Sequence, residues 1–108
     1  MSESTTEPRP ADDRERALIR RFRQAPLGPY DVELEAFLRP LRNLPAAGKH
    51  ALMRLPREGG WTLVRLGGRE RAVEPIGGRW VSRADAEWAV FRARWQEVRG
   101  WDPEQPDV

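Results

Sequence analysis

Residues 79–100, Arg-Trp-Val-Ser-Arg-Ala-Asp-Ala-Glu-Trp-Ala-Val-Phe-Arg-Ala-Arg-Trp-Gln-Glu-Val-Arg-Gly, form the best-specified stretch of this sequence. Ser82 and Asp85 have the spacing of a helix N-terminal capping box. Gly100 stands where a residue in the left-handed conformation often ends a helix. Together these signals predict a long helix over residues 82–100.

Apolar residues lie on two sides of this predicted helix. One side carries residues spaced by four, three, four and three positions, namely Ala84, Trp88, Phe91, Trp95 and Val98, and we expect it to lie on a sheet. The opposite side carries Ala86, Ala89, Val90 and Ala93, where an exposed helix would normally carry charges. Two interpretations remain open: alanine simply favours helix, or this strip allows close approach of another chain.

Two shorter helices are predicted before this stretch. Asp12 and Glu15 have capping spacing at the start of the first, which Pro26 ends. Asp31 can cap the second helix. Pro40 lacks an amide donor and disfavours the helical conformation at Arg39, so we expect this helix to end or kink there.

The segment after the second helix has the pattern of short strands separated by glycine pairs. The expected strands are residues 49–55, 61–66, 71–76 and 79–81, the last being a short strand or an extended lead-in to the final helix. Glycine pairs at 59–60, 67–68 and 77–78 would form the turns. The sequence therefore predicts an α+β fold: two N-terminal helices, a three- to four-stranded antiparallel β-meander and a C-terminal amphipathic helix packed on the sheet.

The length of 108 residues allows one small domain, which we place at residues 12–101. Residues 1–11 have no apolar periodicity and are expected to be a disordered leader, and residues 102–108 an acidic flexible tail. There is no apolar run of membrane-spanning length, and the first residues lack the features of a signal peptide. We therefore expect a cytoplasmic protein that does not associate with a membrane.

This sequence contains few side chains that could form a catalytic or metal-binding site. There is no Cys, and His50 is the only imidazole, so we interpret it as a packed or interfacial residue. Asp31, Glu33 and Glu35 are interpreted as a cap and a solvated face, and the glycine pairs do not have the spacing of a phosphate-binding loop. We predict no catalytic, cofactor-binding or metal-binding residues in this chain. The candidate residues for a partner interface are Ala86, Ala89, Val90, Ala93, His50 and Trp61.

The charge distribution leaves one alternative open. The net charge is +2, but each end carries an excess of three negative charges, so the body between them carries +8. Its cations are almost all Arg, which suits contacts to carboxylates and phosphates but also follows from a general composition bias. Arg65, Arg69 and Arg71 near Trp61 and Trp80 could bind single-stranded nucleic acid. Acidic residues in the same hairpins argue against it, so nucleic-acid binding is the less favoured prediction.

The order of short motifs resembles one known family. The motifs are Gly-Pro-Tyr at 28–30, Phe-Leu-Arg-Pro-Leu-Arg at 37–42, Leu-Pro-Ala-Ala-Gly-Lys-His at 44–50, Trp-Thr-Leu-Val-Arg-Leu at 61–66 and the strand-to-helix unit at 77–99. Over about residues 29–99 the chain is similar to the small (alpha) subunit of N,N-dimethylformamidase.

This resemblance implies a small subunit that packs on a much larger catalytic subunit in a hetero-oligomeric amidohydrolase. Such an enzyme cleaves the C–N bond of formamides to an amine and formate. The resemblance also implies that the iron and its ligands belong to the large subunit, so no catalytic residue is carried over to this chain.

Overall fold

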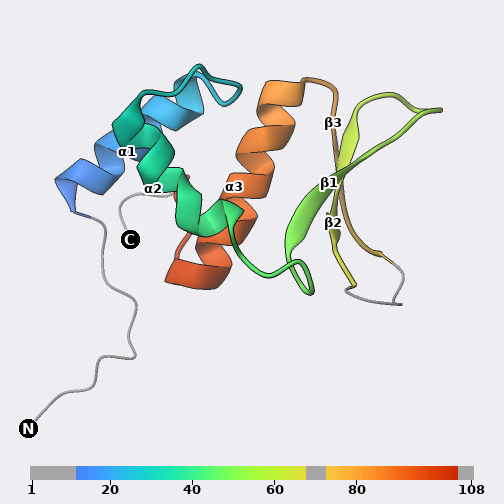
Figure 1. Cartoon of the computed structure of the whole chain (residues 1–108). Helices are drawn as coiled ribbons and strands as arrows, with labels where there is room; N and C mark the ends of the chain where they lie inside the picture. The colour runs from blue at the N-terminus through green and yellow to red at the C-terminus, as the bar shows by residue number, and fades with distance from the viewer. Residues whose placement is uncertain (1–11, 68–72, 105–108) are drawn as a thin grey trace, which may run out of the picture.

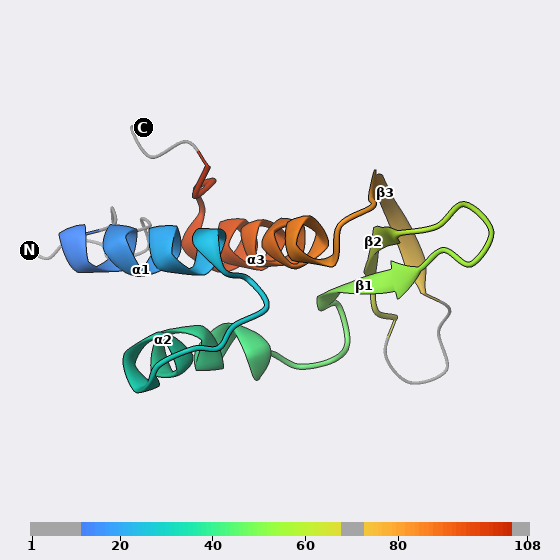
Figure 2. The same cartoon turned by 90° about the horizontal axis from the view of Figure 1, so that it is seen from above.

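The computed structural model describes residues 12–67 and 73–104, which form three helices and one three-stranded sheet. The elements are, in chain order, α1 (Asp13–Gln24), α2 (Val32–Arg42), β1 (His50–Arg54), β2 (Trp61–Arg65), β3 (Glu74–Trp80) and α3 (Arg83–Arg99). Figures 1 and 2 show α3 between the α1–α2 pair and the sheet. The predicted α+β class and the contact of the last helix with the sheet are confirmed.

The two N-terminal helices begin at the predicted caps. Asp12 accepts a hydrogen bond from the Glu15 amide at 2.7 Å, and Asp31 accepts one from the Leu34 amide at 2.8 Å. An end of α2 near Arg39, one of the two outcomes expected at Pro40, is wrong, because the helix continues through Pro40 to Arg42. Proline removes one donor from the helix, but burial of the Leu41 side chain in the core favours keeping the last turn.

The sheet is an antiparallel meander in the order β1-β2-β3. The hairpin β1–β2 has regular register, with His50 opposite Arg65 and Arg54 opposite Trp61. The predicted turn at 77–78 and the separate fourth strand are wrong, since both glycines lie inside β3. Between β2 and β3 the register shifts twice, which places extra β3 residues opposite β2 in the manner of β-bulges. The expected turn at 67–68 and the first residues of the expected third strand fall largely outside the described residues.

The aromatic side of α3 packs on the other helices. Trp88, Phe91 and Trp95 belong to one buried cluster, whose other members come from α1 and α2: Leu18, Ile19, Phe22, Leu34, Leu38 and Leu41. The ring centroids of Phe22 and Phe91 lie 4.9 Å apart. The expectation that this side faces the sheet is therefore wrong. The helices α1 and α2 also present a large apolar surface. Burying this surface against the large rings of α3 is favourable, because aromatic side chains bury a large apolar area.

Val90, from the side of α3 with smaller residues, lies next to the sheet. Val90 lines a pocket together with Ala51 and Leu52 of β1. Because both sides of α3 are covered within the chain, this helix is apolar on two faces. Val64 of the central strand β2 is buried as well.

The chain after α3 folds back on that helix. Gly100 ends the helix with a φ of +85°, as predicted from the sequence. Asp102 accepts two hydrogen bonds from Arg92 at 3.1 and 2.7 Å, and Glu104 accepts one from the indole nitrogen of Trp88 at 2.8 Å. Within the described residues no helix has the length and apolar character needed to span a bilayer.

Candidate functional site

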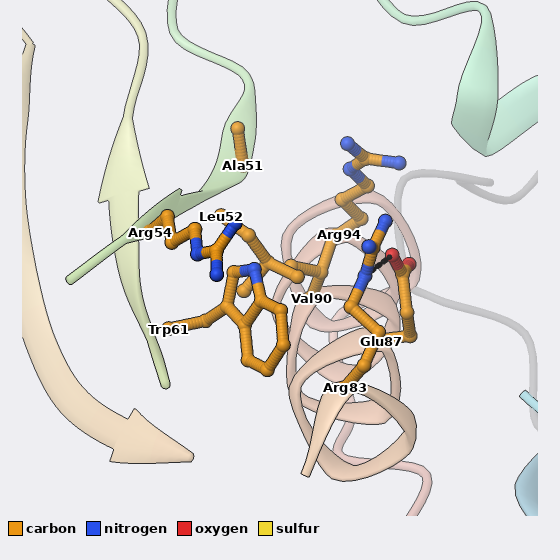
Figure 3. A pocket seen from close by; sticks show the side chains of 8 residues that line it. All are labelled: Ala51, Leu52, Arg54, Trp61, Arg83, Glu87, Val90 and Arg94. Atoms are coloured by element: carbon orange, nitrogen blue, oxygen red, sulfur yellow. Dashed lines mark hydrogen bonds and ion pairs between the residues drawn. The ribbon is translucent and has the colours of Figure 1, made fainter. Parts of the chain in front are cut away.

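A pocket of about 340 Å³ lies between the β1–β2 hairpin and α3. We call it the Trp61 pocket, and its lining consists of Ala51, Leu52, Arg54, Trp61, Arg83, Glu87, Val90 and Arg94. Figure 3 shows that Arg54 and Trp61 come from the sheet, whereas Arg83, Glu87 and Arg94 come from α3. The pocket thus combines a short apolar surface with an indole ring and three guanidinium groups.

The turn before β2 sets the position of Trp61. Gly60 has a φ of +85°, and a Cβ there would overlap the Trp80 carbonyl oxygen, so the turn requires glycine. Arg79 of β3 donates hydrogen bonds to the carbonyl oxygens of Gly59 at 2.9 Å and Glu58 at 2.6 Å. These contacts hold the hairpin against β3 and fix where the Trp61 indole enters the pocket.

The three arginines of the pocket differ in whether their guanidinium groups already have a hydrogen-bond or ion-pair partner among the described residues. Arg83 donates to Glu87 at 2.9 Å, and its guanidinium lies 5.6 Å from the centre of the Trp61 ring. Arg94 donates twice to the His50 carbonyl oxygen, at 3.0 and 2.9 Å. Burial lowers the pKa of Arg94, but a guanidinium remains protonated in proteins. Arg54 is exposed and has no hydrogen-bond or ion-pair partner among the described residues.

His50 lies in a polar cluster beside this pocket. Its Nε2 is 3.2 Å from the Arg65 guanidinium, and its Nδ1 is 3.4 Å from a carboxylate oxygen of Glu97. A guanidinium can only donate, so Nε2 accepts and the ring proton is assigned to Nδ1. Burial and the neighbouring Arg65 lower the pKa of His50, which keeps the ring neutral at physiological pH.

The residues predicted for a partner interface differ in how exposed their side chains are. Ala86, Ala89 and Val90 are 0%, 9% and 4% exposed, so these three side chains are buried within the described chain. The reason is that this side of α3 lies against the chain's own elements. Trp61 and Ala93 retain partly exposed side chains, and Trp61 lines the pocket. His50 is buried beside it.

Sequence reasoning missed the arginines that line the pocket. The sequence pattern places Arg54 in a strand and Arg83 and Arg94 in a helix, and it does not bring them together. The signal available in the sequence was the spacing of 83, 87, 90 and 94, which places these residues on one helix face. What the sequence does not reveal is that the end of β1 and the start of β2 meet that face.

The described residues offer no arrangement suited to a metal ion. No group of three or more His, Asp or Glu side chains converges among residues 12–67 and 73–104. Nε2 of His50 contacts Arg65, whereas Nδ1 lies 3.4 Å from a carboxylate oxygen of Glu97 and makes no hydrogen bond within the described residues. The iron implied by the family resemblance therefore finds no fitting donor set in this part of the chain.

The family model described as N,N-dimethylformamidase alpha subunit matches residues 4–105, nearly the entire chain.

The chain belongs to the N,N-dimethylformamidase alpha subunit family.

A search of curated proteins found no match. For this alpha subunit the family assignment confirms the resemblance based on residues 28–99 and extends it to α1 and to the segment after α3. Membership as an alpha subunit indicates a protein that works within a complex of several subunits. The Trp61 pocket lies inside the matched range, as does the His50 cluster.

Proposed function

We propose that this chain is the non-catalytic small subunit of an N,N-dimethylformamidase-like amidohydrolase. In this proposal it packs on a large catalytic subunit, which holds the iron and performs the hydrolysis of the formamide C–N bond. The complex would be a cytoplasmic hetero-oligomer. The observation that carries the proposal is the family match over residues 4–105.

The chemistry of the described residues supports a non-catalytic role for this chain beside a catalytic large subunit. His50 has its ring nitrogens against Arg65 and Glu97, and burial lowers its pKa, so it is a poor general base for an outside substrate. The pocket beside it carries arginines and a Trp, which are residues enriched at the energetically important positions of protein interfaces. The chain thus has more of the features of a binding partner than of a catalyst.

Co-expression tests this proposal. The chain would be produced together with a candidate large hydrolase chain, with an affinity tag on only one of the two. Co-purification at fixed stoichiometry, seen as one peak on size exclusion, is the expected result. Separate elution, with full formamide hydrolysis by the large chain alone, would contradict it.

A further inference from the structure

The residues that line the Trp61 pocket carry an excess of positive charge. Three Arg and one Glu line it, which leaves two positive charges in excess. Arg83 is paired with Glu87, and Arg94 is bound to the His50 carbonyl oxygen, a neutral group. Arg54 faces the pocket without a partner among the described residues. The pocket therefore attracts an anionic group, and Arg54 is the donor that is free to bind it.

The shape of the pocket favours a side chain over a large ligand. Its volume of about 340 Å³ is at the lower end for small-molecule sites, and the apolar residues Leu52 and Val90 line it along with the charges. A carboxylate on a short aliphatic stem can place its methylene groups against these residues while its oxygens meet Arg54. Arg with a carboxylate is a bidentate pair of good geometry.

Two features favour a protein carboxylate over nucleic-acid phosphate. Glu87 lies within the pocket, and its repulsion opposes a run of phosphates more strongly than a single carboxylate. The Trp61 ring has the Arg83 guanidinium 5.6 Å from its centre, so a cation already lies near the ring on which a base would stack.

We propose that the Trp61 pocket receives an Asp or Glu side chain of the large subunit, with Arg54 as its main counter-charge. This inference rests on the proposed function, because it takes the large subunit as the partner. The pocket would then be one anchor point of the interface, with Trp61 excluding water around the ion pair.

Charge reversal at Arg54 provides the first test. In the complex with the large subunit, Arg54→Glu is expected to weaken binding by about a hundredfold and Arg54→Ala by about tenfold. Arg20→Glu, an exposed substitution on α1, is the matched control and should change the affinity less than about threefold. Thermal unfolding of each isolated variant would show that the fold is retained.

Rescue by the partner provides the second test. The chain has no cysteine, so Ala51→Cys introduces a single thiol at the pocket for a short photoreactive cross-linker. Mass spectrometry of the cross-linked complex would identify the acidic residue of the large subunit. Reversing that residue to Lys should restore binding of Arg54→Glu.

The outcomes separate the inference from the proposed function. If the parent chain does not bind the large subunit, the proposed function fails. If the parent binds and Arg54→Glu binds equally well, or the reversed pair shows no rescue, only the pocket assignment is overturned. Salt-dependent binding of a single-stranded oligonucleotide that is lost in Arg54→Glu would also overturn it.

Discussion

Replacing Trp95 by Ala tests the packing of α3 on the two N-terminal helices. Trp95 is 3% exposed, and its ring lies 5.5 Å from that of Phe37, 5.6 Å from Phe91 and 5.4 Å from Trp101, measured between centroids. Removing a buried Trp side chain costs about 3 to 5 kcal/mol. The indole nitrogen of Trp95 is buried without a hydrogen-bond partner in the described chain, and losing an unsatisfied donor offsets part of that cost. We therefore expect Trp95→Ala to lower the free energy of unfolding by about 3 kcal/mol.

Urea titration followed by far-ultraviolet circular dichroism measures this change. A chain of this length has a total unfolding free energy of about 5 to 15 kcal/mol, so a loss of 3 kcal/mol gives a clear shift in midpoint. Trp95→Phe keeps most of the ring contacts and removes the unpaired donor, and should cost less than about 1.5 kcal/mol.

Val98→Ala is the control on the same helix side. Val98 is 51% exposed, and its truncation should change stability by about 0.5 kcal/mol or less. If Trp95→Ala costs no more than Val98→Ala, the packing of α3 described here is wrong.

The other predictions concern the sheet side of α3, the His50 cluster and the segment after α3. Ala86→Leu adds volume at a site that is 0% exposed, and should destabilise by about 1 to 3 kcal/mol; Ala36→Leu, exposed on α2, should change the urea midpoint little. Burial lowers the pKa of His50 from its ordinary value of 6.5 in the folded chain. As the pH falls below 6.5, the unfolded chain therefore binds a proton at His50 more readily than the folded chain does. The stability advantage of the parent over His50→Gln should therefore shrink as the pH falls from about 7.5 to 5.5, and a constant difference would contradict this. The hydrogen bonds from Arg92 lower the pKa of Asp102, so its contribution is present above pH 3.8 and lost as the pH falls through the folded value. Asp102→Asn should cost about 1 kcal/mol at neutral pH, allowing for the partial exposure of Arg92, and nothing at low pH; acid titration of the two chains checks it.

The local signals in the sequence are sufficient for the starts of the helices and for the first hairpin. Asp12, Asp31 and Ser82 cap the helices as predicted, because a capping side chain acts within three residues of the chain. The predicted helix end near Arg39 and the predicted turn at 77–78 are wrong, because tertiary packing and strand pairing override local preference.

The orientation of α3 could not be predicted from the sequence. Both of its sides are apolar, so the helix pattern does not decide which one meets the sheet and which one meets α1 and α2. The structure assigns the large rings to the helices and Val90 to the sheet. The Trp61 pocket depends on this orientation, so the sequence pattern alone does not reveal its arginines as a group.

The most direct test of the account is hydrolysis of N,N-dimethylformamide by three preparations: this chain alone, the candidate large subunit alone and the two together. Release of formate and dimethylamine would be measured at matched iron content. The account predicts no turnover by this chain alone and greater or more lasting turnover by the pair than by the large subunit. Turnover by the purified 108-residue chain by itself would contradict it.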